Sequence, residues 1–170
     1  IKGIMNLMNA AKEKSISKII HTSTSEVYGT AKFVPMTEKH QLSAQSPYAA
    51  SKIGADQLAI SYYKSYNLPI SILRPFNTYG PRQSLRAIIP TIITQFLDHK
   101  LKKIKIGNVH VTRDFNYIDD TVDAFISTIK AKNIIGETIN IGSGKETSVK
   151  DLLKIVSKIT SRKKTIIREK

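Results

Sequence analysis

The sequence predicts an α/β fold, in which helices and strands alternate along the chain. The first indication is residues 17–24, which have the pattern of a buried strand that ends in small hydroxyl residues. The second is that apolar residues at helical spacing both precede and follow this strand. The third is that the alternation continues to the end of the chain, and strict alternation is typical of the α/β class. With 170 residues, the chain is long enough to bury one ordinary core.

Turn and cap residues delimit the elements of the first half. Ser46 is the expected N-cap of a long helix, and Pro47 suits its first turn. Residues 67–69 (Asn-Leu-Pro) should end that helix. The expected elements are a helix over residues 3–14, a strand over 17–24, an irregular stretch over 31–45, a helix from 47 to about 66, and a strand over 70–73.

The second half continues the alternation. Ser148 and Asp151 have the spacing of a capping box at the start of a helix. Asp119 and Asp120 stand together at an expected helix start, so we interpret them as capping residues rather than as a catalytic pair. The expected elements are a helix over residues 88–100, strands near 104–106 and 111–117, a helix from 119 or 120 to 131, a strand over 138–141, a helix after 148, and a strand over 165–167.

The composition excludes several functional classes. A hydrophobic content of 41% is that of a globular domain. No apolar run approaches the roughly 20 residues of a membrane-spanning helix, and the start of the sequence lacks the pattern of a secretory signal, so we expect a cytoplasmic protein with no membrane contact. The absence of cysteine excludes disulfides and thiolate chemistry, and the four histidines show no ligand spacing. We therefore expect no metal.

The formal net charge of +14 comes from lysines spread along the chain. Residues 162–164 (Arg-Lys-Lys) make the one compact cluster, and no aromatic side chain is interleaved with it as single-strand binding would require. A solvated lysine-rich surface explains most of this charge, and the remainder suits steering of a doubly charged small substrate. Nucleic acid is not expected as a partner.

Tyr48 and Lys52 form the first catalytic candidate. Four residues apart on a helix, they share one face, so the ammonium group can sit beside the phenol. A neighbouring cation favours the phenolate form, which makes Tyr48 a candidate base. Thr24 and Glu26 follow the strand over 17–24, and open α/β sheets bind ligands beyond the carboxyl ends of their strands. We therefore expect these four side chains at one site.

Further motifs follow one another along the chain: STSEVYG at 23–29, YAASK at 48–52, RPFNTYGPRQ at 74–83, RDFNYIDD at 113–120 and NIGSG at 140–144. With these motifs in this order, the chain resembles the extended short-chain dehydrogenase/reductase family, NAD-dependent enzymes that act on nucleotide sugars. The resemblance implies a doubly wound, Rossmann-type parallel sheet plus a small substrate-binding α/β subdomain.

No glycine-rich phosphate loop follows any expected strand, so the chain is expected to be the carboxyl-side part of a longer enzyme, with the glycine-loop half absent. The resemblance places the second half of the NAD-binding domain in residues 1–75. It places the substrate-binding subdomain mainly in residues 76–170, interleaved with the sheet near 104–141. It also implies a homodimer formed through the helix that bears Tyr48 and the helix that starts near Gly3.

The resemblance also implies roles for individual residues. NAD is the implied cofactor and a nucleotide sugar the implied substrate. The implied catalytic set is a strand-end hydroxyl with the Tyr and the Lys, and the Lys and Tyr also contact the cofactor. Arg offers a planar fork of donors that suits a diphosphate. The implied positions are Thr24, Tyr48 and Lys52 for catalysis, Pro75 and Phe76 near the nicotinamide, and Thr24, Asn77 and Arg113 for the substrate.

Glu26 and Ser25 decide the expected subclass. Epimerases of the family generally carry a small uncharged residue at the position of Glu26, whereas in 4,6-dehydratases a Glu removes the C5 proton after oxidation at C4. Glucose-type dehydratases place an Asp immediately before this Glu, and this chain has Ser25 there. Mannose-type and N-acetylhexosamine-type dehydratases resemble this chain in carrying Thr-Ser-Glu, so Glu26, with water or Ser25, is expected to handle both protons.

The overall resemblance is greatest to bacterial nucleotide-sugar 4,6-dehydratases of the legionaminic-acid type, with a nucleotide-N-acetylhexosamine as the expected substrate and polysaccharide biosynthesis as the expected context. Two alternatives on the same scaffold stay open: a nucleotide-sugar 4-epimerase and a nucleotide-glucuronate decarboxylase, whose motif also resembles STSEVYG. A third, of another class, is a basic binding module without catalysis, which would capture nucleic acid in a strongly salt-dependent way.

Overall fold

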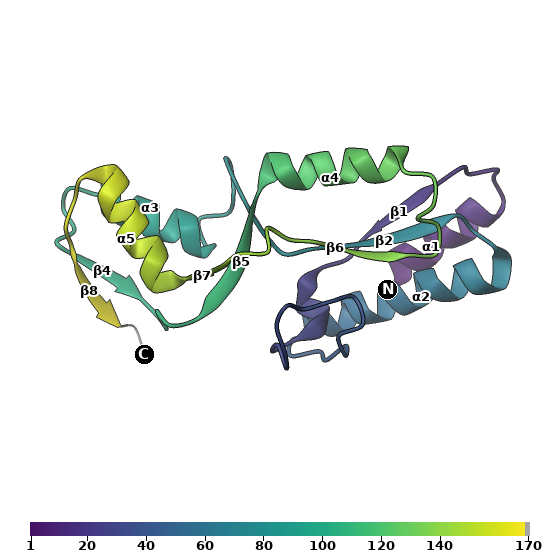
Figure 1. The fold of residues 1–170 in the computed structure, drawn as a ribbon, viewed down its shortest axis with the longest axis horizontal. Coiled ribbons are helices and arrows are strands. Elements are labelled where there is room, and N and C mark those ends of the chain that lie inside the picture. The colour runs from purple at the N-terminus through teal and green to yellow at the C-terminus, as the bar shows by residue number, and fades with distance from the viewer. Residues whose placement is uncertain (169–170) are drawn as a thin grey trace. The chain divides into compact units, whose positions relative to one another are not determined.

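The computed structural model describes residues 1–168 and divides the chain into two compact units (Figure 1). Unit 1 comprises Ile1–Thr78 and Ile118–Gly142, and unit 2 comprises Tyr79–Tyr117 and the residues from Ser143 onward. The chain therefore crosses between the units three times. Each unit is described by itself below.

Unit 1 is built on a parallel sheet with helices on both faces, and its strands lie in the order β1-β2-β6 (Figure 1). Ile19 pairs with Ile70 across the first strand pair, and Leu73 pairs with Ile139 across the second. The apolar side chains of α1, α2 and β2 form its core around Met8, which is fully buried. The elements are α1 (Lys2–Lys12), β1 (Ile19–Thr22), η1 (Ser25–Tyr28), α2 (Pro47–Tyr66), β2 (Ile70–Pro75), α4 (Ile118–Lys130) and β6 (Thr138–Ile141).

The predicted boundaries of α2 are confirmed. The Ser46 side chain accepts a hydrogen bond from the Ala49 backbone N–H at 3.0 Å, and Pro47 stands in the first turn. At the other end, Asn67 adopts the left-handed conformation (φ 53°) and caps the helix. The capped first turn fixes the position of Tyr48, which is the second residue of the helix.

The end of the first strand differs from the prediction. The strand stops at Thr22 rather than Thr24, and a short 3-10 helix, η1, follows. The sequence did not indicate this helix, because four residues are too few to show a helical period. Its cause is local: the Thr24 side chain accepts a hydrogen bond from the Glu26 N–H at 3.3 Å. Gly29 ends it with φ 67°.

Gly29→Ala is expected to destabilise the protein by about 2 kcal/mol or more, because an L-residue at this positive φ is strained. The added Cβ would also stand 2.5 Å from the Ser43 backbone oxygen. Thermal unfolding of the complete gene product measures the effect. Gly3→Ala is the matched control, since Gly3 lies in helix α1 with nothing within 4 Å, and that change should be neutral or stabilising. Equal midpoints for the two variants would contradict the account of η1.

Unit 2 combines two small sheets with two helices. Strand β4 pairs in parallel with β8, and β5 pairs antiparallel with β7. Helices α3 and α5 pack over a core that includes Phe96 and Leu153. The Ser148 side chain accepts a hydrogen bond from the Asp151 N–H at 3.0 Å, which confirms the predicted cap. The elements are α3 (Ile88–Leu97), β4 (Lys103–Ile106), β5 (Thr112–Tyr117), β7 (Glu146–Ser148), α5 (Val149–Thr160) and β8 (Thr165–Arg168), with β3 (Asn77–Tyr79) at the boundary of the units.

The predicted α/β class with parallel sheets is confirmed, with further local differences. Strands β3 and β7 were not predicted, because strands of three residues carry no readable alternation. Helix α3 ends at Leu97 instead of residue 100, with Asp98 in an extended conformation.

In the part of the chain that the structure describes, no helix has both the length and the apolar character needed to cross a membrane.

Candidate active site

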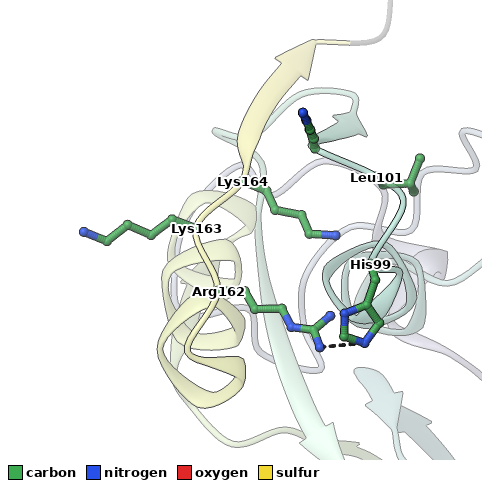
Figure 2. A pocket seen from close by; sticks show the side chains of 6 residues that line it. His99, Leu101, Arg162, Lys163 and Lys164 are labelled. Atoms are coloured by element: carbon green, nitrogen blue, oxygen red, sulfur yellow. Dashed lines mark hydrogen bonds between the residues drawn. The ribbon is translucent and has the colours of Figure 1, made fainter.

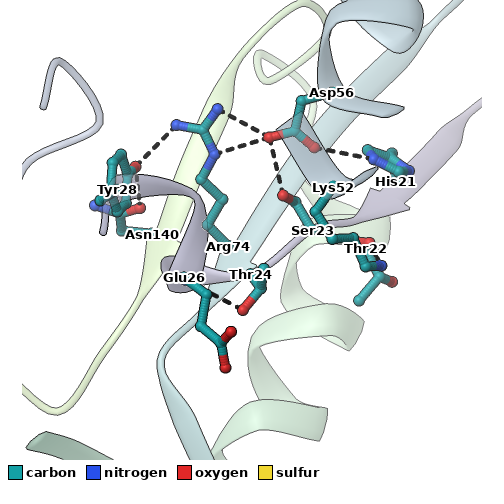
Figure 3. Close-up of polar contacts among 10 residues, drawn as sticks. All are labelled: His21, Thr22, Ser23, Thr24, Glu26, Tyr28, Lys52, Asp56, Arg74 and Asn140. Carbon is teal, nitrogen blue, oxygen red and sulfur yellow. Dashed lines mark hydrogen bonds and ion pairs between the residues drawn. The ribbon is translucent and has the colours of Figure 1, made fainter. Parts of the chain in front are cut away.

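The first turns of α2 lie at the carboxyl end of β1. Tyr48 is half-exposed, at 50% of its surface, and Lys52 follows one turn later. The Lys52 ammonium donates a hydrogen bond to the Thr22 carbonyl at 3.0 Å (Figure 3). It lies 6.0 Å from the centre of the Tyr48 ring. One cation therefore links the helix that carries Tyr48 to the last residue of the strand that leads to Thr24.

Thr24, Ser25 and Glu26 form the turn that follows β1. Thr24 and Ser25 are partly buried, and Glu26 is exposed. Figure 3 shows the Glu26 carboxylate pointing away from the buried side chains behind it. The short helix thus holds the Thr24 hydroxyl inward against the Glu26 N–H and directs the carboxylate outward.

A buried charged cluster lies directly behind this turn (Figure 3). The Asp56 carboxylate is fully buried and accepts hydrogen bonds from the Ser23 hydroxyl at 2.9 Å and from two nitrogens of Arg74 at 2.9 and 3.1 Å. Its other oxygen lies 3.0 Å from His21 Nε2. No motif in the sequence predicted this cluster. The available signal was Arg74 itself, since a charged residue in a buried strand needs a partner.

The same arginine holds Tyr28. A third nitrogen of Arg74 donates to the Tyr28 hydroxyl at 2.9 Å, and that hydroxyl donates to Asn140 Oδ1 at 2.7 Å. Burial raises the pKa of the Tyr28 phenol above its ordinary value, so it remains a neutral donor. Tyr28, unlike Tyr48, is therefore part of the packed interior: only 1% of its surface is exposed.

The protonation of Asp56 follows from its partners. Burial alone would raise the pKa of its carboxyl. Hydrogen bonds from His21 and Ser23, together with the charge of Arg74, outweigh burial and hold that pKa below its ordinary value. The group therefore stabilises the fold above its unfolded pKa of about 3.9, and this contribution is lost as the pH falls through the folded pKa.

Asp56→Asn is expected to lower the free energy of unfolding by about 3 kcal/mol at neutral pH, because it leaves the Arg74 charge buried without its counter-ion. The deficit should begin to shrink as the pH falls below about 4, where the carboxyl of the unfolded parent becomes protonated, and should keep shrinking until the pH passes the lower pKa of the folded state. Denaturant unfolding of parent and variant between neutral and acidic pH measures it. A deficit that stays constant over that range would contradict the assigned charge state.

The remaining site candidates of unit 1 lie at the same edge of the sheet. Pro75 ends β2 and pairs with Ile141 at the end of β6, and the Phe76 N–H donates to the Ile141 carbonyl at 2.8 Å. Pro75, Phe76 and Asn77 are all partly buried. Because β1, β2 and β6 are parallel, their carboxyl ends meet at one edge, the edge where open α/β sheets bind ligands.

Arg113 belongs to unit 2. It is exposed on β5, and its guanidinium donates to the Thr112 carbonyl at 2.8 Å. The neighbouring Asp114 carboxylate accepts hydrogen bonds from the N–H groups of Ser143 and Gly144, each at 2.9 Å, and from the Ser143 hydroxyl at 2.6 Å. Asp114 thus fixes the turn before β7, and substrate binding by Arg113 stays a prediction.

The compact basic cluster predicted from the sequence lines a hollow of about 300 Å³ in unit 2 (Figure 2). Arg162 and Lys164 donate to the backbone carbonyls of residues 95–98, which end helix α3. Cations at a helix carboxyl end neutralise its free carbonyls and its dipole. Figure 2 shows Lys163 extending away from the hollow. Helix capping therefore accounts for the two inward-pointing cations.

Among residues 1–168, no group of three or more His, Cys, Asp or Glu side chains is arranged to hold a metal ion. The candidate site accordingly consists of hydroxyl, phenol, ammonium and carboxylate groups. Such a set can move protons and hold a polar ligand.

The chain is similar to known nucleotide-sugar dehydratases and epimerases. The family model described as GDP-mannose 4,6 dehydratase matches residues 1–170. The dTDP-D-glucose 4,6-dehydratase of Dictyostelium discoideum is 39% identical over 94% of this chain and 39% of its own length. The chain spans about half the length of the curated relatives it matches.

Two solved structures are similar in sequence and fold. The UDP-glucuronic acid 4-epimerase of Bacillus cereus, solved with UDP-glucuronic acid and NAD, is 36% identical with a TM-score of 0.91, over 98% of this chain and 53% of the other. An NAD-dependent NDP-hexosamine 5,6-dehydratase involved in tunicamycin biosynthesis is 31% identical with a TM-score of 0.88, over 99% of this chain and 55% of the other. Dehydratases and an epimerase are thus both among the similar proteins.

Proposed function

The chain belongs to the family described as GDP-mannose 4,6 dehydratase, and from that membership we propose that the protein is an NAD-dependent nucleotide-sugar 4,6-dehydratase. Solved relatives that carry NAD support the cofactor. The observation that carries the choice of reaction is Glu26, an exposed carboxylate one turn beyond β1 and directed away from the buried cluster (Figure 3). It is the group needed to take a proton from carbon after oxidation.

The residues at the edge of the sheet fit NAD. Lys52 holds an ammonium at the carboxyl end of β1, where it can also reach ribose hydroxyls, and Tyr48 presents a half-exposed phenol beside it. Pro75 and Phe76 lie at the end of the next strand and would border the nicotinamide. When bound, NAD supplies the hydride acceptor and donor.

The first step is oxidation at C4 of the sugar. Tyr48 takes the proton of the 4-hydroxyl while the hydride leaves C4, which forms the 4-ketone. The Lys52 ammonium stands beside the Tyr48 ring, and the Thr24 hydroxyl provides a hydrogen bond to the same oxygen.

The second step is loss of water. The 4-ketone acidifies the C5 proton, and Glu26 removes it as the C6–O bond breaks. The same proton, carried by Glu26 directly or through water or Ser25, leaves with the 6-hydroxyl as water. Hydride then returns to C6, and the proton that Tyr48 took from the 4-hydroxyl balances the one added at C5. The product therefore differs from the substrate by one water, and Tyr48 and Glu26 return to their starting states.

Similarity to the hexosamine dehydratase supports a nucleotide-N-acetylhexosamine as substrate, and legionaminic-type specificity is part of this proposal. A nucleotide-sugar 4-epimerase is the second candidate, favoured by the similarity to the UDP-glucuronic acid 4-epimerase. The epimerase would use Tyr48, Thr24 and Lys52 in the same way and would need no base at Glu26.

We further propose that the protein is a cytoplasmic homodimer formed through α1 and α2. Three apolar residues at the start of the chain, Ile1, Met5 and Leu7, are 64%, 39% and 57% exposed, which is costly on a free surface. A monomeric mass of the complete gene product in solution would contradict the dimer.

Product mass tests the proposed reaction. The complete gene product, loaded with NAD, is incubated with uridine and guanosine diphosphate esters of N-acetylglucosamine and with UDP-glucuronate. We expect one nucleotide-N-acetylhexosamine to lose one water. An unchanged mass with inverted configuration would establish the epimerase, and release of carbon dioxide would establish the decarboxylase.

A further inference from the structure

We infer that Asp56 is a positioning residue, which fixes the Tyr48–Lys52 helix and the Thr24–Glu26 turn in one catalytic arrangement. The inference rests on the proposed function of the same site and adds to it a group that touches neither substrate nor cofactor. The buried carboxylate belongs to the helix and contacts the segment that leads into the turn.

On one side, Asp56 continues the catalytic face of α2. It lies one turn beyond Lys52 and two turns beyond Tyr48, and residues at this spacing lie above one another on a helix. Tyr48 is half-exposed, Lys52 is partly buried and Asp56 is fully buried, so the face runs from the open end of the site into the interior. A displacement of Asp56 would therefore be transmitted along the helix to both side chains.

On the other side, Asp56 holds the residue just before the catalytic turn. The Ser23 hydroxyl donates to Asp56 Oδ2 at 2.9 Å, and the next residue is Thr24 (Figure 3). Ser23 is itself 3% exposed, so water does not compete for this bond. One carboxylate therefore joins the helix that carries the base to the segment that carries the strand-end hydroxyl.

Arg74 connects Asp56 to the far end of the turn. It donates to Asp56 with two nitrogens and to the Tyr28 hydroxyl with a third. Tyr28 follows Glu26 by two residues and closes the same 3-10 helix. Buried hydrogen bonds therefore fix the turn at Ser23 and at Tyr28, and Thr24 and Glu26 lie between these two positions.

Energetics favour a geometric role over a purely stabilising one. A buried ion pair recovers little net stability against apolar residues of the same volume, because both charges lose their hydration. Asp56 and Arg74 are nevertheless almost completely buried, at 0% and 3% exposure. Unlike an apolar side chain, a carboxylate accepts several directed hydrogen bonds. Here one comes from Ser23, and two come from Arg74, which also donates to Tyr28 at the far end of the turn.

Ser23→Ala tests the inference, because it removes the bond to the turn and leaves the Asp56–Arg74 pair intact. Ser71→Ala is the matched control: Ser71 is also buried on the same sheet and donates one bond, to the Ile134 carbonyl at 2.7 Å. Both variants of the complete gene product should lose a similar amount of thermal stability. Only Ser23→Ala should lower kcat, by about tenfold or more, with KM and retained NAD unchanged.

Amide hydrogen exchange provides a readout that does not depend on turnover. The Glu26 and Gly29 N–H groups bond within the turn, to Thr24 Oγ1 and to the Glu26 carbonyl. We expect the peptide spanning residues 24–29 to exchange faster in Ser23→Ala than in Ser71→Ala. Equal exchange and equal kcat in the two variants would overturn the positioning role. A parent enzyme that forms no dehydrated product would instead refute the proposed function, and the exchange comparison would still decide the role of Asp56.

Discussion

Tyr48→Phe is expected to lower turnover of the nucleotide sugar by about 10²–10⁴-fold, the usual contribution of a positioned acid–base group. The change removes one oxygen from a half-exposed ring in the capped first turn of α2, so the helix and its N-cap should be unaffected. Without the Tyr48 oxygen, no side chain of the proposed site takes the 4-hydroxyl proton as hydride leaves C4. Steady-state turnover of the complete gene product, measured by product mass, provides the value.

Tyr66→Phe is the matched control for this prediction. Tyr66 ends the same helix and is also 50% exposed, and its ring lies 3.9 Å from the Lys12 ammonium, a contact that does not need the hydroxyl. Turnover in this variant should equal that of the parent. Retained turnover in Tyr48→Phe, with thermal stability equal to the control, would remove Tyr48 from the mechanism.

Glu26→Gln is expected to abolish loss of water, also by about 10²–10⁴-fold, while oxidation at C4 continues. Glutamine keeps the size of the side chain and the N–H bond to Thr24, and loses only the basic carboxylate. Since the 4-ketone then has no group to remove its C5 proton, reduced cofactor should accumulate on adding substrate. Absorbance of the reduced nicotinamide, followed together with product mass, separates the two steps.

Glu13→Gln, an exposed carboxylate at the end of α1, is the control and should behave like the parent. The epimerase gives a different pattern, since that reaction requires no base beyond Tyr48. Full conversion of substrate by Glu26→Gln, with no accumulation of reduced cofactor, would therefore contradict the dehydratase and favour the epimerase.

Local chemistry made most of the fold predictable. The α/β alternation followed from apolar periodicity, and the caps at Ser46 and Ser148 followed from side chains that compete for free N–H groups. The missed elements, η1, β3 and β7, have only three or four residues, so contacts rather than periodicity determine them. Thr24 provides the example: its side chain, by accepting the Glu26 N–H, starts a turn where the apolar pattern indicated a continuing strand.

The candidate site was predictable only where its residues form motifs. The spacing of Tyr48 and Lys52 on a helix was enough to identify them as a pair. The structure adds the hydrogen bond from Lys52 to the Thr22 carbonyl. The Asp56–Arg74 pair joins positions 18 residues apart through tertiary packing. No local pattern encodes such a partner, and the predicted strand ended at residue 73, so the sequence did not indicate the pair.

Transfer of an isotope label from C4 to C6 distinguishes the proposed 4,6-dehydration from 4-epimerisation. The complete gene product is incubated with a nucleotide-N-acetylhexosamine that carries deuterium at C4, and the position of the label in the product is read by nuclear magnetic resonance. Because the proposed dehydratase returns the same hydride to C6, we expect the deuterium at C6, in a product lacking one water. Deuterium found back at C4, in a product of unchanged mass, would contradict it.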